Sequence, residues 1–269
     1  MGLKTKIEYA DSTHSFWYGC DKISEGCQNC FAEKIYKRFM GKDFSKIIKS
    51  KNFDAPLKWK KPRVILVNDM SDFFHEKVDN LWRWGAIEVF LKSPQHIFLL
   101  LTKRPKNMYE FFNSRFIDAD LKNVSKNIWL GVSVENQRTA DERIPELLKI
   151  PHFKKWISFE PLLSMVNASR YLPCNSCNND GFVEYGTPCS CGGINRGKYI
   201  DWIVAGAETG KGARPMQSDW AKNLLNQCKN AGVPFFMKQM TNRKPIPKDL
   251  MVREYPKEIG AITNADNKV

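Results

Sequence analysis

Three cysteines near the N-terminus, Cys20, Cys27 and Cys30, have the residue type and the spacing to hold a metal unit within one loop. Structural zinc sites are normally closed by four protein ligands, whereas an iron–sulfur cluster on three thiolates keeps one iron open to a substrate or cofactor. An open metal position indicates chemistry rather than scaffolding. The residues leave one alternative, a zinc ion whose fourth ligand is His14 or an acid.

A second group of four cysteines lies further along the chain, at Cys174, Cys177, Cys189 and Cys191. Two close pairs within a short segment rich in Gly and Asn are typical of a tetrahedral zinc site, which folds a loop too polar to form its own core. We therefore predict a zinc-binding insertion over residues 173–196. A second iron–sulfur cluster is the alternative, because four cysteines can also hold one.

The composition narrows the class of partner. The 269 residues include 42 basic and 29 acidic side chains, a formal net charge of +13. This balance favours an anionic partner such as a nucleotide or nucleic acid, although an evenly solvated basic surface has the same composition. No apolar run approaches the roughly 20 residues that span a bilayer, and the N-terminus is charged where a secretory signal would be apolar. We therefore expect no membrane association and a cytoplasmic, reducing compartment, where clustered cysteines are more often ligands than disulfides.

The elements that must position these cysteines follow a repeated pattern of a short apolar run, a polar loop and a segment of helical periodicity. This pattern is typical of α/β folds, and the near-continuous apolar runs indicate parallel strands buried on both faces. The candidate strands span residues 64–68, 96–102, 127–133, 155–159, 199–205 and 233–238. The candidate helices span residues 79–92, 105–112, 140–149 and 219–231, and the last should bury Cys228 as a structural thiol.

Polar side chains follow each candidate strand. Because the C-terminal ends of parallel strands meet at one rim, where such folds bind ligands, these side chains should converge. Each one alone is equally typical of a helix cap or a solvated loop. The four-cysteine insertion precedes the fifth strand, and we expect it on the same rim. The polar set comprises Asn68, Asp69, Ser71, Asp72, Lys103, Arg104, Ser133, Glu135, Asn136, Glu160, Glu208 and Lys238.

Eight segments, in order along residues 7–240, together resemble the phage three-Cys-motif family, a group of radical-SAM-like proteins. The segments are GCDKISEGCQNCFAE (19–33), VNDMSDFFH (67–75), LTKRP (101–105), WLGVSVEN (129–136), SFEPLL (158–163), AGAETG (205–210), ARPM (213–216) and PFFMKQ (234–239). The spacing between Cys20 and Cys27 is longer than the commonest spacing in radical-SAM enzymes.

The resemblance implies a partial (β/α) barrel of radical-SAM type over residues 1–240, interrupted by the insertion and followed by a C-terminal tail, 241–269. It implies a [4Fe–4S] cluster on Cys20, Cys27 and Cys30, with S-adenosylmethionine on the open iron. In such enzymes the reduced cluster cleaves S-adenosylmethionine to a 5′-deoxyadenosyl radical, which abstracts hydrogen from the substrate. An electron donor is therefore an implied partner.

The resemblance also implies roles for the polar rim. The loop after the first strand should meet the methionine amino group, through Asn68, Asp69, Ser71 and Asp72. The loop after the third should meet the ribose or carboxylate of the cofactor, through Ser133, Glu135 and Asn136. The catalytic candidates that face cofactor or substrate, besides the three cysteines, are Glu160, Glu208 and Lys238, with Arg214 beside them.

The sequence thus predicts a radical S-adenosylmethionine enzyme that modifies a nucleotide, a nucleic acid or another anionic substrate. One alternative is a zinc or iron–sulfur protein that binds nucleic acid without catalysis. Another is an iron–sulfur redox or sensor protein. The substrate, the oligomeric state and the need for a partner protein stay open at this point.

Overall fold

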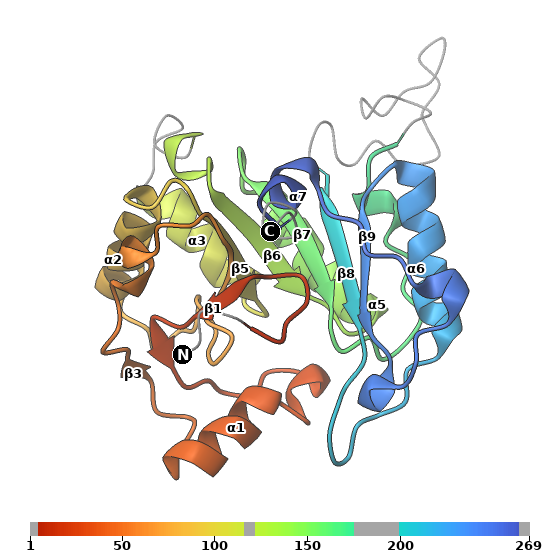
Figure 1. Ribbon diagram of the computed structural model, residues 1–269, viewed down its shortest axis with the longest axis horizontal. Helices are drawn as coiled ribbons and strands as arrows, with labels where there is room; N and C mark the ends of the chain where they lie inside the picture. The colour runs from red at the N-terminus through yellow and green to blue at the C-terminus, as the bar shows by residue number, and fades with distance from the viewer. Residues whose placement is uncertain (1–4, 116–121, 175–198, 264–269) are drawn as a thin grey trace.

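Seven parallel strands form one sheet, which curls into a half-barrel with helices around its outer face (Figure 1). The computed structural model describes residues 5–115, 122–174 and 199–263. The strand order is β1-β4-β5-β6-β7-β8-β9, so neighbours in the sheet are also successive in the chain. The predicted α/β partial barrel with parallel strands is confirmed. The strands are β1 (Ser12–His14), β4 (Val64–Val67), β5 (Ile97–Thr102), β6 (Ile128–Ser133), β7 (Lys154–Phe159), β8 (Trp202–Gly206) and β9 (Phe235–Gln239).

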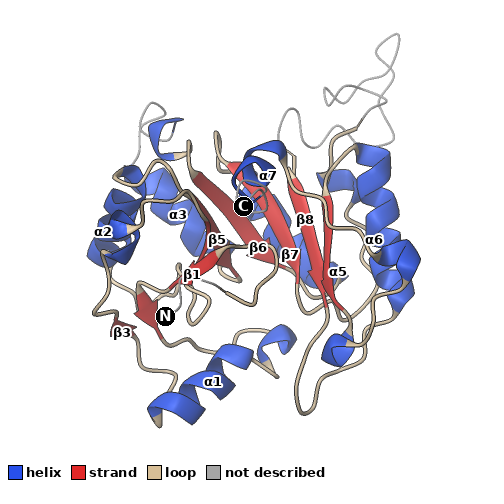
Figure 2. Ribbon diagram, in the orientation of Figure 1, coloured by secondary structure: helices blue, strands red, loops and turns tan. Residues whose placement is uncertain are grey.

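Four helices connect successive strands and cover the outer face of the sheet, as Figure 2 shows. They are α2 (Asn80–Leu91), α3 (Pro105–Arg115), α5 (Gln137–Leu148) and α6 (Ser218–Ala231). Local chemistry sets their ends. The Asp79 carboxylate accepts the Leu81 N–H at 2.8 Å and begins α2. Gly232 ends α6 with a left-handed φ of 67°. The four predicted helices are confirmed, with ends displaced by up to three residues.

The two faces of the sheet carry different cores. The outer core packs phenylalanines and aliphatic side chains between strands and helices, and it includes Cys228, which is fully buried as predicted. The inner face is filled by aromatic rings, among them Trp129, Trp156 and Trp202. Gly131 makes room for one of them, since a Cβ at this position would lie 2.4 Å from the indole nitrogen of Trp156. The tryptophans of the strands are therefore core residues.

Several elements that the structure describes were not predicted. They include strand β1, helix α1 (Phe31–Met40), which follows the cysteine loop, and helix α7 (Lys257–Thr263). The short antiparallel pair of β2 (Trp17–Tyr18) with β3 (Ile48–Lys49) was not predicted either. Among the residues that the structure describes, no helix is long and apolar enough to cross a bilayer.

The described part of the C-terminal tail, residues 241–263, packs against the barrel. The Met237 N–H donates to the Val252 carbonyl at 2.8 Å, so the segment runs along strand β9. Leu250 and Ile259 are fully buried, the second of them in the inner core. Much of the segment that we predicted to be a separate C-terminal tail is thus an integral part of the half-barrel.

The four-cysteine insertion falls largely outside the described residues. Cys177, Cys189 and Cys191 lie there, and Cys174 is partly exposed. The flanking residues are placed: the Ile200 N–H donates to the Tyr171 carbonyl, and the Asp201 N–H donates to the carbonyl of Lys155 near the start of β7. The chain therefore leaves and re-enters the fold near the N-terminal ends of β7 and β8. We expected the insertion at the opposite end of the strands, so that expectation is wrong for both flanks.

Candidate functional site

The cysteine loop, residues 19–30, begins on the loop that follows strand β4. The Gly19 N–H donates to the Met70 carbonyl at 3.2 Å, and the Ser71 hydroxyl donates to the Gly19 carbonyl at 2.7 Å. Gly19 has a φ of 100°, and a Cβ there would lie 2.3 Å from the Lys46 carbonyl oxygen. Only glycine fits this close approach. Ser71, predicted to bind the cofactor, therefore anchors the backbone next to Cys20.

Arg104, at the end of strand β5, joins Cys20 to the rim. Its guanidinium donates to Cys20 Sγ at 3.7 Å, to the Asp21 carbonyl at 3.3 Å and to Asp72 Oδ2 at 3.2 Å. Asp72 also accepts from Thr102 Oγ1 at 2.6 Å and from the Lys103 N–H at 3.1 Å. Both carboxylate oxygens of Asp72 are thus occupied by the protein itself. Asp72 therefore holds Arg104 in place, and its contact with the cofactor stays a prediction.

Glu135, after strand β6, contacts the middle of the cysteine loop. Its carboxylate is fully buried, accepts from Ser24 Oγ at 2.6 Å and pairs with Arg143 at 3.0 Å. A Cβ on Gly26 would lie 2.3 Å from Glu135 Oε1, so the loop backbone rests directly on this carboxylate. The neighbouring Asn136 is the N-cap of α5 and donates its side-chain amide to Glu25. Both residues therefore shape the loop between Cys20 and Cys27.

Glu208, after strand β8, contacts the end of the cysteine loop. It accepts from Asn29 Nδ2 at 2.9 Å and from the Arg214 N–H at 2.8 Å. The Arg214 guanidinium in turn donates to the Glu25 carbonyl at 2.9 Å. Burial favours the neutral acid, but hydrogen bonds from Arg214 and Asn29 outweigh it and lower the pKa of Glu208. An ionised Glu208 thus holds the segment between Cys27 and Cys30.

Another part of the rim is formed by Glu160 and Lys238, which pair at 2.6 Å across strands β7 and β9. The Ser133 hydroxyl accepts from Lys103 Nζ at 3.0 Å and donates to the Glu160 carbonyl at 3.0 Å. Tyr9 lies beside this pair, and burial together with the Glu160 charge raises the pKa of Tyr9 well above its usual value. Lys103 thus links the Glu160–Lys238 pair, through Ser133, to the surroundings of Cys27.

The two remaining predicted residues lie after strand β4. Asn68 has a left-handed φ of 56°, and its Oδ1 accepts the Phe16 N–H at 2.8 Å. Its Nδ2 is buried and has no hydrogen-bond partner among the described residues. Asp69 accepts from Ser15 Oγ at 2.9 Å, and burial raises the pKa of this carboxyl. The Asn68 amide nitrogen is therefore open to a ligand, whereas the Asp69 carboxylate is held by Ser15 and Thr13.

The sulfur atoms of Cys20 and Cys27 lie in unequal electrostatic surroundings. Burial and the Asp72 charge raise the pKa of Cys20 to about 12, against the opposing charge of Arg104. Burial also disfavours the Cys27 thiolate, but the Lys103 charge and hydrogen bonds from Ile23 and Ser24 outweigh it and lower the pKa of Cys27. All three thiols of the triad are partly exposed, so each can take a metal ligand position.

One described set of three His, Cys, Asp or Glu side chains has its ligand atoms all within 4.8 Å of one another, and it is Asp21, His75 and Glu76 rather than the triad. Cations already compensate this set: Asp21 pairs with Lys77 at 2.6 Å, and Glu76 pairs with Arg104 at 2.5 Å. It is therefore a weak cation site.

His14, the fourth ligand in the zinc alternative, is part of the core. Its ring is 1% exposed, lies edge-on to Phe16 and has its Nε2 3.2 Å from the Phe53 carbonyl. Burial lowers the pKa of His14 to about 4. These contacts do not favour the interpretation in which His14 completes a zinc site with the triad.

The structure thus brings strand-end residues from β4, β5, β6 and β8 into contact with the cysteine loop. Sequence reasoning found these rim residues but missed their partners in the loop, Ser24, Glu25, Gly26 and Asn29. Their position between the cysteines was the signal that could have identified them.

Fold and site together define an α/β half-barrel with a three-cysteine loop bound to its strand-end rim. The chain belongs to the family described as "Protein of unknown function (DUF5131)", whose family model matches residues 4–265. No curated protein and no solved structure matches it.

Proposed function

We propose that the protein is a radical S-adenosylmethionine enzyme in which Cys20, Cys27 and Cys30 hold a [4Fe–4S] cluster. The observation that carries the proposal is the attachment of a partly exposed three-thiol loop to the C-terminal ends of parallel strands. Ligands of such folds bind at this end of the strands. The sequence resemblance to the phage three-Cys-motif family supports the same assignment.

The three thiols are not arranged as the ligands of one ion. In a mononuclear zinc site each Zn–S bond is about 2.3 Å, so the sulfur atoms lie roughly 4 Å apart. The three thiols do not all lie within 4.8 Å of one another. In an iron–sulfur cluster each thiolate binds a different iron, and the sulfurs are further apart. The cations Arg104 and Lys103 beside Cys20 and Cys27 favour the negative charge that bound thiolates carry.

When bound, the reduced cluster would supply an electron to S-adenosylmethionine and so generate a 5′-deoxyadenosyl radical. The residues of the rim have separate tasks in this proposal. Asp72, Glu135 and Glu208 are positioning residues, because their carboxylates are occupied by Arg104, Ser24 and Asn29. They hold the three cysteines in a fixed arrangement on the rim.

Side chains that keep hydrogen-bonding capacity are better candidates for contact with the cofactor or the substrate. Asn68 Nδ2 is buried without a described partner, and a carboxylate or ribose oxygen would satisfy it. Asp69 is the next residue in the chain, and the charge of a ligand ammonium group nearby would favour its ionised form. The Glu160–Lys238 pair can separate to contact polar groups of a ligand. An anionic substrate, nucleotide or nucleic acid, agrees with the net charge of +13.

The test is anaerobic reconstitution with iron and sulfide, followed by reduction in the presence of S-adenosylmethionine. We expect about four irons in the triad and release of 5′-deoxyadenosine. Cys27→Ala should abolish the release while the protein stays folded. Cys228→Ala, which alters a buried thiol of the outer core, is the matched control and should retain it. Zinc in the triad together with no cofactor cleavage would exclude the proposal.

We propose separately that Cys174, Cys177, Cys189 and Cys191 bind a structural zinc ion. Two close cysteine pairs in a polar segment support this assignment. A Cys174→Ser/Cys177→Ser double variant should lose one zinc per chain and little iron. Loss of iron in place of zinc would indicate a second iron–sulfur cluster.

A further inference from the structure

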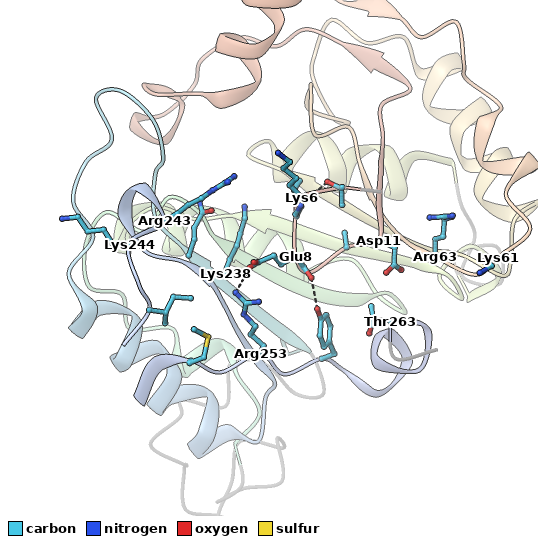
Figure 3. A pocket seen from close by; sticks show the side chains of 17 residues that line it. Lys6, Glu8, Asp11, Lys61, Arg63, Lys238, Arg243, Lys244, Arg253 and Thr263 are labelled. Carbon is cyan, nitrogen blue, oxygen red and sulfur yellow. Dashed lines mark hydrogen bonds and ion pairs between the residues drawn. The ribbon is translucent and has the colours of Figure 1, made fainter. Parts of the chain in front are cut away.

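A large cavity lies on the open side of the half-barrel, between its two edge strands β1 and β9. Its volume is about 1160 Å³, larger than most small-molecule pockets. Its walls come from parts of the chain that are far apart in the sequence: residues 5–11, 61–63, 238–246 and 251–255, with Thr263. The cavity, called the seam groove below, is shown in Figure 3.

Cations dominate the seam groove. Among the described residues that line it, seven side chains are basic and two, Glu8 and Asp11, are acidic. Both carboxylates are already bound within the protein, since Glu8 pairs with Arg253 at 2.6 Å and Asp11 accepts the Val64 N–H at 2.7 Å. The basic side chains are Lys6, Lys61, Arg63, Lys238, Arg243, Lys244 and Arg253.

Three of these cations are available to a ligand. Lys6, Arg243 and Lys244 are exposed and form no ion pair with any described residue. Arg243 sits at a left-handed φ of 57°, directly after Asn242, whose side chain accepts the Gly210 N–H at 2.8 Å. A backbone in this region is costly for a residue other than glycine, so the surrounding contacts hold the turn that presents Arg243.

The arrangement of the charges indicates a long ligand. Figure 3 shows the cations spread from Lys244 and Arg243 on one side to Arg63 and Lys61 on the other, with Lys6 between them. In a site for one small anion, the cations would converge on a single point. Lys238 lies in the same groove and pairs with Glu160 on the strand-end rim. The groove therefore leads to the rim that carries the cysteine loop.

We propose that the seam groove binds single-stranded nucleic acid through its phosphates. A positively charged groove that follows the backbone is the feature by which proteins bind single strands. As a substrate site this proposal rests on the proposed function, whereas as a binding site it rests on the groove alone. Nothing in the binding step requires the metal cluster.

The lining also bears on the sequence preference of the groove. Tyr255 is its aromatic member, and its hydroxyl donates to the Glu8 carbonyl while its ring packs on Phe236 and Trp202. Because the described part of the lining offers no free stacking platform, phosphate contacts dominate. We therefore expect weak sequence preference and a strong dependence on salt.

The test compares two triple variants that each remove three positive charges. The groove variant is Lys6→Gln/Arg243→Gln/Lys244→Gln. The control is Lys106→Gln/Lys126→Gln/Lys229→Gln, whose residues are exposed and lie outside the groove. Fluorescence anisotropy with labelled 20-nucleotide single-stranded DNA, single-stranded RNA and duplex DNA gives Kd from about 0.05 to 0.2 M salt. A poly-glutamate peptide tests for binding of any polyanion.

The groove variant should bind single strands at least about 10-fold more weakly at 0.1 M salt. The plot of the logarithm of the binding constant against the logarithm of the salt concentration should also become less steep. Its slope should fall in magnitude by about 2, near 0.7 for each phosphate that the variant no longer neutralises. The control variant should change Kd less than about 2-fold. An equal loss of affinity in both variants, equal affinity for poly-glutamate, or tighter binding of duplex would overturn the proposal. The DNA and RNA arms identify which polymer is preferred.

The same samples separate this proposal from the proposed function. Binding by protein that cannot cleave S-adenosylmethionine would leave the seam groove valid and reject the radical chemistry. If the protein cleaves S-adenosylmethionine but the groove variant binds nucleic acid with unchanged Kd, the radical chemistry would stand and the seam groove would be rejected. A circular dichroism spectrum and a urea midpoint for each variant show that both are folded.

Discussion

At the scale of single residues, Arg104 joins the start of the cysteine loop to the strand-end rim. It is nearly buried, pairs with Asp72 and donates to both the sulfur of Cys20 and the carbonyl of Asp21. The Asp72 and Cys20 charges beside it raise the pKa of the guanidinium, although burial opposes them, so it stays charged at any ordinary pH. A fixed cation at this point orients Cys20 and favours its thiolate.

Replacing Arg104 should therefore lower the stability of the protein. In Arg104→Leu the buried Asp72 carboxylate loses its partner, and we expect a loss of about 3 kcal/mol in the free energy of unfolding. Arg138→Leu is the control, because Arg138 forms an exposed pair with Glu142 and should cost less than about 1 kcal/mol. Urea unfolding measures both. Similar midpoints for the two variants would contradict the role given to Arg104.

His14 should make stability depend on pH. Its pKa in the folded protein is about 4, below the ordinary 6.5, so the unfolded chain binds a proton first as the pH falls. Stability is therefore fully present above pH 6.5 and is lost as the pH falls from 6.5 towards 4. Between pH 7 and 5 this amounts to about 2 kcal/mol. Urea unfolding at pH 7 and pH 5 measures this loss of stability. In His14→Gln the loss between the two pH values should be smaller by that amount, and an unchanged loss would refute the lowered pKa of His14.

At the scale of elements, the cysteine loop is a segment with little hydrophobic core, held by hydrogen bonds from four strand ends. The cysteines and the rim residues could be predicted from spacing and from the apolar runs before them. The direct contacts could not, because Ser24 and Glu135 are 111 residues apart and meet only in the folded barrel. For the same reason the sequence did not reveal that Asp72, Glu135 and Glu208 support the loop.

The close packing of this loop on the rim can be tested at Gly26. A methyl group there would collide with the Glu135 carboxylate, which Arg143 and Ser24 hold in place. Gly26→Ala should cost about 1–3 kcal/mol and expose Cys27 to faster alkylation in the metal-free protein. Gly85→Ala is the matched control, since its Cβ would meet the Phe53 ring at an ordinary 3.4 Å. Equal alkylation rates in the two variants would show that the loop does not need this close approach.

At the scale of the whole molecule, the half-barrel is completed by chain segments outside the repeated βα units. Apolar runs predicted six of the seven strands, but β1 is three residues long and polar, with Ser12, Thr13 and His14. Helix α1 leaves Phe31 and Phe39 exposed, so its apolar pattern does not report burial. Helix α7 is too short for periodicity to reveal, and its contribution depends on Ile259, which reaches the inner core.

The C-terminal segment should therefore matter for global stability. Ile259→Ala removes a fully buried side chain from the inner core, and we expect a cost of about 2–4 kcal/mol. Leu81→Ala truncates a side chain that is 75% exposed and should cost less than about 1 kcal/mol. Thermal unfolding with a urea series would compare them. If Ile259→Ala were as mild as Leu81→Ala, the segment would be peripheral.

The most direct test of the proposed three-cysteine cluster is electron paramagnetic resonance of the reconstituted, reduced protein with and without S-adenosylmethionine. Because three thiolates leave one iron open, the cofactor should bind that iron and shift the g values of the cluster signal. The shift should vanish in Cys27→Ala and persist in Cys228→Ala. A signal that S-adenosylmethionine leaves unchanged in the unmutated protein, or no cluster signal at all, would contradict the account.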